Sequence, residues 1–337
     1  MKQFEKLLKA KIRDFIVIKA HADGVKRLFA ALEVYVHETK EAATVIVAID
    51  LETLAVELVH EANGASLDYA YSAGWHGLLQ RDRVIEIDGG KTITTAPKLR
   101  GDGKLTAIAR TGTSTLVSGT NGSVLHKYPI DGFVAKVAKG ELAMLMETSA
   151  LGGNQGPLAT VVVGASGTVY AAGGAMGDDR RYRLFSGVES FVGASVSTGE
   201  IYSLHELPDR TVMVGAREAA EIVRGGTAQT LSGVIGRIHG TTTFRGTEYW
   251  MGHDGADYIT LFKRAGTKLS KKYRTKYHYV GYRSLEGAPE ARMTATEDLL
   301  LVTNKERIHI YDGKKWTQLG IQPDVKKLAK RLPAAMK

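Results

Sequence analysis

The chain has no cysteine among its 337 residues, and it contains only seven prolines. Without thiols there is no disulfide, no thiolate ligand for a metal ion and no cysteine nucleophile. No apolar run reaches the roughly 20 residues that span a bilayer, and the start of the chain carries charges every two or three positions, unlike a secretory signal peptide. The lack of a membrane span and of a signal peptide favours a cytoplasmic protein, while the lack of cysteine does not by itself fix the redox compartment.

Recognisable catalytic motifs are also missing. The chain has no His-Glu-x-x-His pair, no Gly-x-Ser-x-Gly nucleophile elbow and no complete phosphate-binding loop. Its ten histidines are dispersed, and the acids of Asp178–Asp179 and of His253–Asp257 lack the spacing of a calcium-binding loop. The sequence therefore predicts no metal ion and no cofactor, and it favours a binding protein over an enzyme.

The net charge of +9 is concentrated in three segments. Met1–Arg13 and Gln322–Lys337 each carry a net charge of +4, and Lys263–Arg283 carries +8, so the remaining chain is mildly acidic. Positive charge that is confined to a few segments indicates a local contact with anions and not a uniformly basic surface.

The most abundant signal is a repeat of short β-prone runs joined by glycine-containing turns, among 38 glycines in all. Asp298–Leu319 shows it clearly, because Asp312-Gly313 separates two alternating runs in the pattern of a β-hairpin. We find seven such units, with turns centred on Glu52, Gly89, Gly132, Gly187, Gly225, Gly266 and Gly313. Their spacings of 37, 43, 55, 38, 41 and 47 residues average about 43, which is typical of one four-stranded propeller blade.

A second strand pair is expected upstream of each turn. In the first unit, Asp14–Ala20 and Leu28–His37 supply it, and in the other units the second strand includes runs such as Arg210–Arg217. The spacing of 55 residues predicts an inserted loop or helical turn within Gly140–Pro157.

This pattern resembles a β-propeller over nearly the whole chain, without the Gly-His and Trp-Asp pairs of WD40 repeats. We therefore predict an all-β fold, a seven-bladed β-propeller of four-stranded antiparallel blades, in residues 14–321. Residues 1–13 form a basic N-terminal segment, and residues 322–337 form a basic tail with a short C-terminal helix. The alternative is a pair of β-sandwiches, but they do not require a four-strand period along the whole chain.

The resemblance implies that the loops between second and third strands, together with the loops between blades, form the ligand-binding face. We therefore predict a monomeric, non-catalytic protein that binds another protein there, for example as a bacterial inhibitor or immunity protein. The expected partner-binding residues are Arg81, Asn121, Asp178, Asp179, Arg181, Arg217, His253, Asp254 and Lys305.

Two alternatives remain open. One is a hydrolase or lyase whose site combines residues of different blades near His253, Asp254 and Asp178. The other is single-stranded nucleic-acid binding, since Lys271, Lys272, Arg274 and Lys276 alternate with Tyr273, Tyr277 and Tyr279. An outer strand protected by lysines explains the second pattern equally well.

Overall fold

The computed structural model describes 28 β-strands and no α-helix in the part of the chain that it covers. That part is residues 14–36, 41–122, 131–138, 140–148, 158–173, 182–188, 190–197, 200–234, 236–254, 258–276, 291–305 and 307–320. The predicted basic segment 1–13 and the predicted C-terminal helix in 322–337 lie outside these residues.

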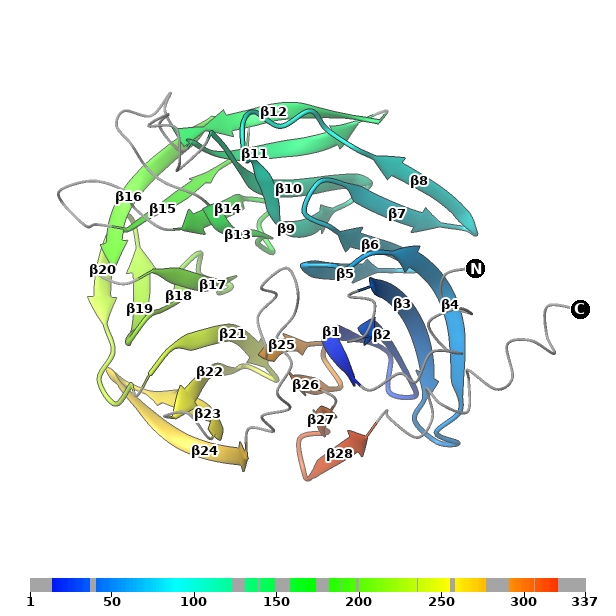
Figure 1. Cartoon of the computed structure of the whole chain (residues 1–337). Coiled ribbons are helices and arrows are strands. Elements are labelled where there is room, and N and C mark those ends of the chain that lie inside the picture. The colour runs from blue at the N-terminus through cyan, green and yellow to red at the C-terminus, as the bar shows by residue number, and fades with distance from the viewer. Residues whose placement is uncertain are drawn as a thin grey trace, which may run out of the picture. The chain divides into compact units, whose positions relative to one another are not determined.

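Every sheet contains four consecutive antiparallel strands, which we number as blades one to seven (Figure 1). Blades one to three contain β1 (Asp14–Asp23), β2 (Arg27–Val36), β3 (Glu41–Asp50), β4 (Val56–Asn63); β5 (Asp68–Ser72), β6 (Trp75–Leu79), β7 (Val84–Asp88), β8 (Lys91–Thr95); β9 (Lys104–Thr111), β10 (Ser114–Asn121), β11 (Asp131–Ala138) and β12 (Glu141–Glu147). Blades four and five contain β13 (Leu158–Val163), β14 (Val169–Gly173), β15 (Tyr182–Gly187), β16 (Phe191–Ser197); β17 (Ile201–Glu206), β18 (Val212–Ala216), β19 (Ala219–Arg224) and β20 (Thr227–Thr230). Blades six and seven contain β21 (Ile238–Phe244), β22 (Thr247–Asp254), β23 (Tyr258–Ala265), β24 (Lys268–Lys276); β25 (Ala291–Ala295), β26 (Leu300–Asn304), β27 (Arg307–Tyr311) and β28 (Trp316–Gly320).

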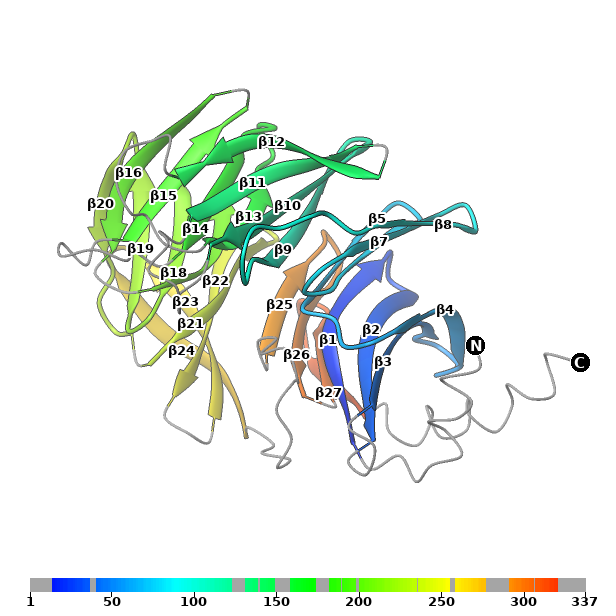
Figure 2. The same cartoon turned by 45° about the horizontal axis from the view of Figure 1, so that its top comes forward.

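The seven sheets are the blades of a β-propeller, so the predicted fold class is confirmed. The tilted view in Figure 2 shows the four strands of one sheet side by side, for example β9 to β12. The chain forms two compact units: residues 1–69 with 277–337, and residues 70–276. The first unit contains blades one and seven, and the second contains blades three to six with nearly all of blade two.

Six of the seven predicted turns join a third strand to a fourth strand, but the turn at Gly132 is wrong. Gly132 lies inside β11, where it pairs with Thr120 of β10. The turn of this blade is at Gly140, which has a φ of 86° that glycine adopts without strain. The Asp-Gly pair suggested a hairpin, but its neighbours continue a buried strand. The fourth strand β12, Glu141–Glu147, occupies the first half of the range Gly140–Pro157, so the predicted insertion does not lie there, and residues 149–157 lie outside the described residues.

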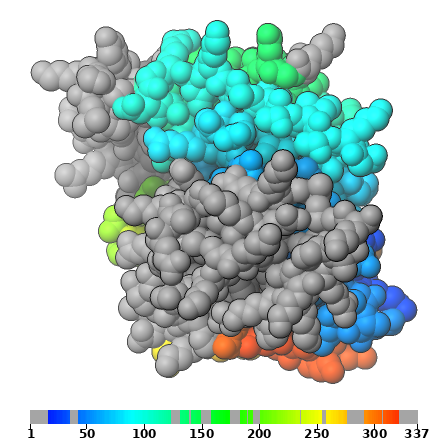
Figure 3. All heavy atoms as spheres, turned by 45° about the vertical axis from the view of Figure 1, so that its right-hand side comes forward, coloured from blue at the N-terminus to red at the C-terminus, as the bar shows by residue number. Residues whose placement is uncertain are grey.

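Burial follows the position of a strand within its blade. All five residues are buried in the second strands β6, β14, β18 and β26, because sheets cover both of their faces. The fourth strand β8 exposes four of its five residues, and this part of the chain forms the cyan surface in Figure 3. The second strands therefore have near-continuous apolar sequences, while the fourth strands tolerate polar residues on both faces.

Blades one and seven share a hydrophobic core within the first unit. Val17, Leu32 and Val47 of blade one belong to the same buried cluster as Leu301 and Ile308 of blade seven. Two hydrogen bonds reinforce the contact between the strands. The Val17 amide donates to the Lys305 carbonyl at 2.7 Å, and the Thr294 hydroxyl donates to the Ala20 carbonyl at 2.7 Å.

In the second unit, each of three large clusters likewise spans two adjacent blades. The first cluster joins Val134 of blade three to Phe185 of blade four, and the next joins Leu184 of blade four to Val214 of blade five. The third joins Met213 of blade five to Trp250 of blade six. The apolar core of the second unit is thus located largely between its blades.

A buried carboxylate connects blades four and five. Glu206, 5% exposed at the end of β17, accepts hydrogen bonds from the Ser166 hydroxyl at 2.6 Å, the Ser166 amide at 2.9 Å and the Tyr170 hydroxyl at 2.6 Å. Burial acts to raise the pKa of Glu206, but these hydrogen bonds outweigh it and hold the pKa below its ordinary value. Burial, followed by the hydrogen bond to Glu206, raises the pKa of Tyr170 to about 12. The β13–β14 turn is therefore fixed to blade five by an ionised acid whose bonds are satisfied.

We predict that Glu206→Gln lowers the free energy of unfolding by about 1–3 kcal/mol, because the amide loses acceptor capacity and a negative charge in a buried site. The measurement is urea unfolding at several pH values. Because the folded-state pKa of Glu206 is depressed, its contribution is complete above its unfolded pKa and is lost as the pH falls through the folded pKa. The difference between wild type and variant must therefore shrink on acidification. The exposed Glu57→Gln is the control, and equal effects of the two substitutions would contradict this role for Glu206.

Candidate functional site

The loops of blades five and six bring two predicted residues, Arg217 and His253, onto neighbouring segments. Arg217 lies in the two-residue connection between β18 and β19, and its backbone forms an antiparallel bridge with Arg237, which directly precedes β21. The His253 amide near the end of β22 donates to the Arg237 carbonyl at 3.0 Å. Arg237 therefore links the two predicted residues through its backbone.

Gly236 makes this close approach of the loops feasible. Its φ is 74°, and a Cβ atom at this position would lie 2.1 Å from the His253 carbonyl oxygen. Its own carbonyl accepts a hydrogen bond from the Glu218 amide at 3.1 Å. Any other residue would both strain the backbone and push the two loops apart.

A row of rings lies next to these arginines. Tyr202 of β17 and His239 of β21 have ring centroids 5.3 Å apart, and the rings of His239 and His253 are separated by 4.8 Å. The Tyr202 hydroxyl donates to Glu200 Oε2 at 2.7 Å. We name Glu200, Tyr202, Arg217, Arg237, His239 and His253 the arginine–histidine cluster.

The electrostatics of this cluster favour neutral rings beside exposed cations. Burial and the hydrogen bond to Glu200 raise the pKa of Tyr202 to about 12, although Arg237 and Arg217 oppose the shift. Burial, and then the charge of Arg237, lower the pKa of His253, so its imidazole is neutral at pH 7. Arg217 and Arg237 are both exposed, and no carboxylate among the described residues forms an ion pair with either of them.

Sequence reasoning missed Glu200, Tyr202, Arg237 and His239. The segments between blades were expected on the same face as the second-to-third loops, and Glu200 and Arg237 lie in such segments. Applying that rule to every connection between blades would have identified these two. Tyr202 and His239 lie on first strands, and their ring contacts depend on the register between blades.

The other predicted residues have different environments. Arg81 is exposed in the β6–β7 loop, and its carbonyl accepts a hydrogen bond from the Leu105 amide at 2.9 Å. Asn121 is 5% exposed, and its Oδ1 accepts a hydrogen bond from the Arg100 amide at 3.2 Å. Lys305, in the first unit, is only 1% exposed. Asp178, Asp179 and Arg181 lie outside the described residues, as does the side chain of Asp254.

The basic residues of the nucleic-acid alternative lie on β24, the fourth strand of blade six. Lys271, Lys272 and Arg274 are exposed, and the Arg274 guanidinium lies 3.5 Å from the centroid of the Tyr258 ring. Tyr273 is half-buried, and burial raises its pKa. The Lys276 side chain lies outside the described residues. The described part of β24 is therefore an outer strand on which Lys271, Lys272 and Arg274 are exposed and the Tyr273 ring is partly buried.

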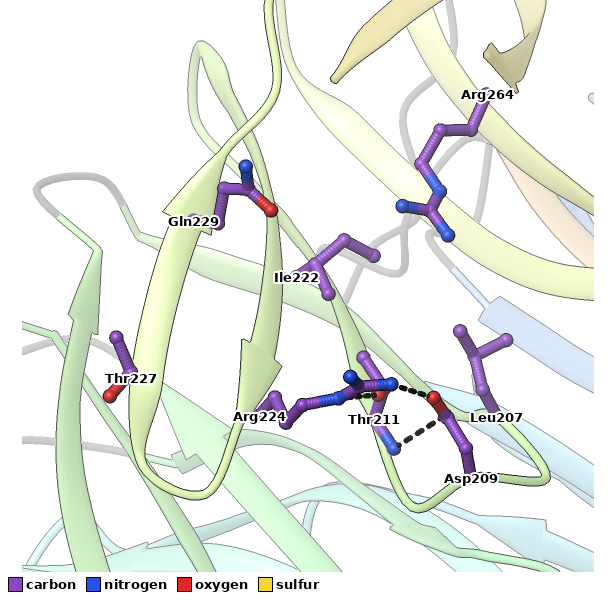
Figure 4. Close-up of a pocket in the computed structure, with 8 residues that line it drawn as sticks. All are labelled: Leu207, Asp209, Thr211, Ile222, Arg224, Thr227, Gln229 and Arg264. Atoms are coloured by element: carbon purple, nitrogen blue, oxygen red, sulfur yellow. Dashed lines mark hydrogen bonds and ion pairs between the residues drawn. The ribbon is translucent and has the colours of Figure 1, made fainter. Parts of the chain in front are cut away.

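Residues of blades five and six also line an open cavity of about 410 Å³ (Figure 4). Figure 4 shows Arg264 above Ile222 and Leu207, and Arg224 below Ile222, where its side chain extends toward Asp209 and Thr211. Each guanidinium already has its own acid: Arg224 pairs with Asp209, and Arg264 forms a bidentate pair with Glu248. The charges lining the cavity are therefore balanced, in contrast to those of the arginine–histidine cluster.

No set of three or more histidine and acidic side chains in the described residues is placed to hold a metal ion. No helix there has the length and apolar character needed to cross a membrane.

We predict that Arg237→Gln raises the pKa of His253, because the substitution removes a positive charge that disfavours the imidazolium ion. The measurement is an NMR titration of the imidazole resonances. Arg224→Gln, which removes an exposed cation from the cavity in the same unit, serves as the control and leaves the pKa of His253 unchanged. Equal shifts in both variants would show that the effect is not local to Arg237.

No protein-family model and no curated protein matches this sequence. Solved structures match it in fold. An acylaminoacyl peptidase of Pyrococcus horikoshii aligns over 95% of this chain with a TM-score of 0.59 and 9% sequence identity. This chain covers 55% of that peptidase, so it spans about half of the peptidase's length.

Two other matches cover most of both chains. The β-propeller domain of the Trilobed protease from Pyrococcus furiosus, described as having an open velcro topology, has a TM-score of 0.56 and 8% identity, with 93% of this chain and 98% of that domain aligned. Saccharomyces cerevisiae Sqt1 has a TM-score of 0.56 and 8% identity, with 92% and 86% aligned. At these identities the likeness is one of fold, and that fold is the β-propeller.

Proposed function

We propose that this chain is a cytoplasmic, non-catalytic binding protein that uses the arginine–histidine cluster to bind an acidic segment of another protein. The observation that carries the proposal is the pair Arg217 and Arg237, two exposed arginines whose backbones form an antiparallel bridge. Arginine and tyrosine are enriched at the energetically dominant positions of protein interfaces.

The chemistry of the cluster specifies the partner. Guanidinium groups bind carboxylates through paired N–H donors, and neutral aromatic rings offer flat apolar surface beside them. Glu200 is hydrogen-bonded to Tyr202, which leaves both arginines available to an incoming acid. The partner segment thus presents Asp or Glu next to an apolar or aromatic side chain, and an inhibitor that occupies such a segment is one form of this role.

The backbone around the cluster is organised before any partner arrives. The Arg217 amide donates to the Glu200 carbonyl at 2.9 Å, and the Arg217–Arg237 bridge joins the loops of two blades. A preorganised site loses less conformational entropy on binding than a loop that folds around its partner. This favours a binding role that does not need a large rearrangement.

We predict that Arg217→Glu with Arg237→Glu weakens partner capture at least roughly ten-fold, because reversal of both charges repels an acidic segment. The measurement is quantitative mass spectrometry of proteins captured from the native cell lysate by wild type and variant baits. Recombinant partner is then titrated to obtain Kd at two salt concentrations, and the wild-type complex weakens as the salt concentration rises.

The matched control reverses two exposed lysines outside the cluster, Lys91→Glu and Lys98→Glu, giving the same change in net charge. A true partner is retained by this control and lost with the arginine variant. Proteins captured equally by all three baits, or lost equally from both variants, would overturn the proposal.

A further inference from the structure

A second concentration of positive charge lies in the first unit, on strands that the arginine–histidine cluster does not involve. Lys19 of β1 and Arg292 of β25 converge on one carboxylate oxygen, Oδ1 of Asp68 at the start of β5. The Lys19 Nζ atom lies 3.1 Å from that oxygen, and a terminal nitrogen of Arg292 lies 3.9 Å from it. The three side chains are 18%, 17% and 4% exposed for Lys19, Arg292 and Asp68.

The donors of the two cations greatly outnumber their acceptors. The Lys19 ammonium has three N–H donors and makes one hydrogen bond within the described part of the chain, to Asp68. The Arg292 guanidinium has five N–H donors, and its buried Nε atom has no acceptor. Asp68 Oδ1 is also shared with the backbone, since it accepts the Tyr69 amide at 2.9 Å. One carboxylate thus serves two cations and an amide.

Among the described residues, no group other than Asp68 accepts a hydrogen bond from, or pairs with, the Lys19 or Arg292 side chain. The Thr294 hydroxyl donates to the Ala20 carbonyl, and the His21 ring contacts the Tyr69 carbonyl through Nε2 at 3.3 Å. Burial is the largest effect on Lys19 and lowers its pKa; Asp68 acts in the opposite direction and Arg292 adds to the decrease. The two cations therefore repel each other in a site from which water is partly removed.

The charge balance differs from that of the other arginines with acid partners. Arg224 and Arg264 in the cavity of blades five and six each have a separate carboxylate. Lys19 and Arg292 together have one among the described residues, so the three side chains carry an excess of one positive charge when Lys19 is protonated. Buried charges are costly unless they are paired, so a bound anion would stabilise this arrangement.

We propose that Lys19, Arg292 and Asp68 form a binding site for an oxyanion group, a carboxylate or a phosphate, of a small molecule. One anion oxygen lies between the Lys19 ammonium and the Arg292 guanidinium, where it accepts the N–H donors that Asp68 leaves unfilled. Asp68 holds the two cations in position and limits the net charge of the site to +1. This site is independent of the proposed protein-binding role.

The test uses the full chain and measures its thermal unfolding against inorganic phosphate or succinate, with chloride keeping the ionic strength constant. A ligand that binds the folded state alone raises Tm in a saturable manner. For wild type we expect an increase of about 2–4 °C at a ligand concentration ten times Kd. The anion that gives the larger increase in Tm shows whether the site prefers a phosphate or a carboxylate. Isothermal titration calorimetry measures the stoichiometry, and we expect one anion per chain.

Three variants make the assignment specific. Lys19→Met and Arg292→Gln each abolish the saturable increase, because each removes one of the two anion donors. Asp68→Asn has the opposite effect and lowers the Kd for the anion at least several-fold, because it raises the positive charge of the site. Calorimetric titration of the folded variant measures this Kd even when the substitution lowers stability. Lys26→Met, at an exposed lysine of the same blade, leaves binding unchanged.

If neither phosphate nor succinate raises the Tm of the wild-type protein in a saturable manner, the proposal is overturned. An increase that persists in both Lys19→Met and Arg292→Gln would overturn it as well, since the anion would then bind elsewhere. If one of these variants does not fold, the other variant and Asp68→Asn still test the site independently.

Discussion

The constraint on which this structure depends is that a four-stranded sheet has two apolar faces and no partner within its own blade. The described core clusters accordingly combine residues of adjacent blades, such as Phe185 with Val134 and Trp250 with Met213. Blades one and seven meet the same requirement across the greatest separation in sequence. They pack Leu32 and Val47 against Leu301 and Ile308 without exchanging a strand, because every sheet consists of consecutive strands. Side-chain packing and hydrogen bonds such as Val17 to Lys305 connect the first and last blades.

Burial of the second strands on both faces confines polar chemistry to a few places. In the second unit, Glu206 is tolerated between blades because three donors satisfy it. Glu86 and Arg110 provide another polar contact between blades two and three, at 3.5 Å, and the Arg110 guanidinium also lies 4.4 Å from the centroid of the Trp75 ring. Such groups fix the register of neighbouring blades, since a displaced partner would leave a buried charge unpaired.

Charge balance separates structural sites from candidate binding sites. The arginines of the cavity each have their own acid, whereas Arg217 and Arg237 lie exposed on bridged backbone segments beside rings. Lys19 and Arg292 present a third arrangement, in which two partly buried cations share the acid Asp68. The first arrangement stabilises the fold, the second suits a macromolecular surface, and the third suits a small anion, because exposure determines the size of the partner that can reach the charge.

Local sequence determined the architecture to a large extent. Tight turns such as those at Gly225, Gly266 and Gly313 require backbone conformations that few residues adopt, and the runs beside them have the alternation of strands, so blade number and strand order followed from their spacing. The exception was Gly132, where a local turn signal was overridden by pairing with Thr120 in the interior of a sheet.

The candidate sites depended more on tertiary structure. Sequence placed Arg217 and His253 on loops, but only the packing of blades five and six brought Arg237, Tyr202 and His239 beside them. In the same way, Asn121 and Lys305 belong to predicted loops but are buried, and Lys19, Asp68 and Arg292 converge from strands far apart in the chain. Local sequence marks most of the tight turns, because they need particular backbone conformations, while burial and convergence of charges depend on side-chain contacts between blades, for which the local pattern contains no signal.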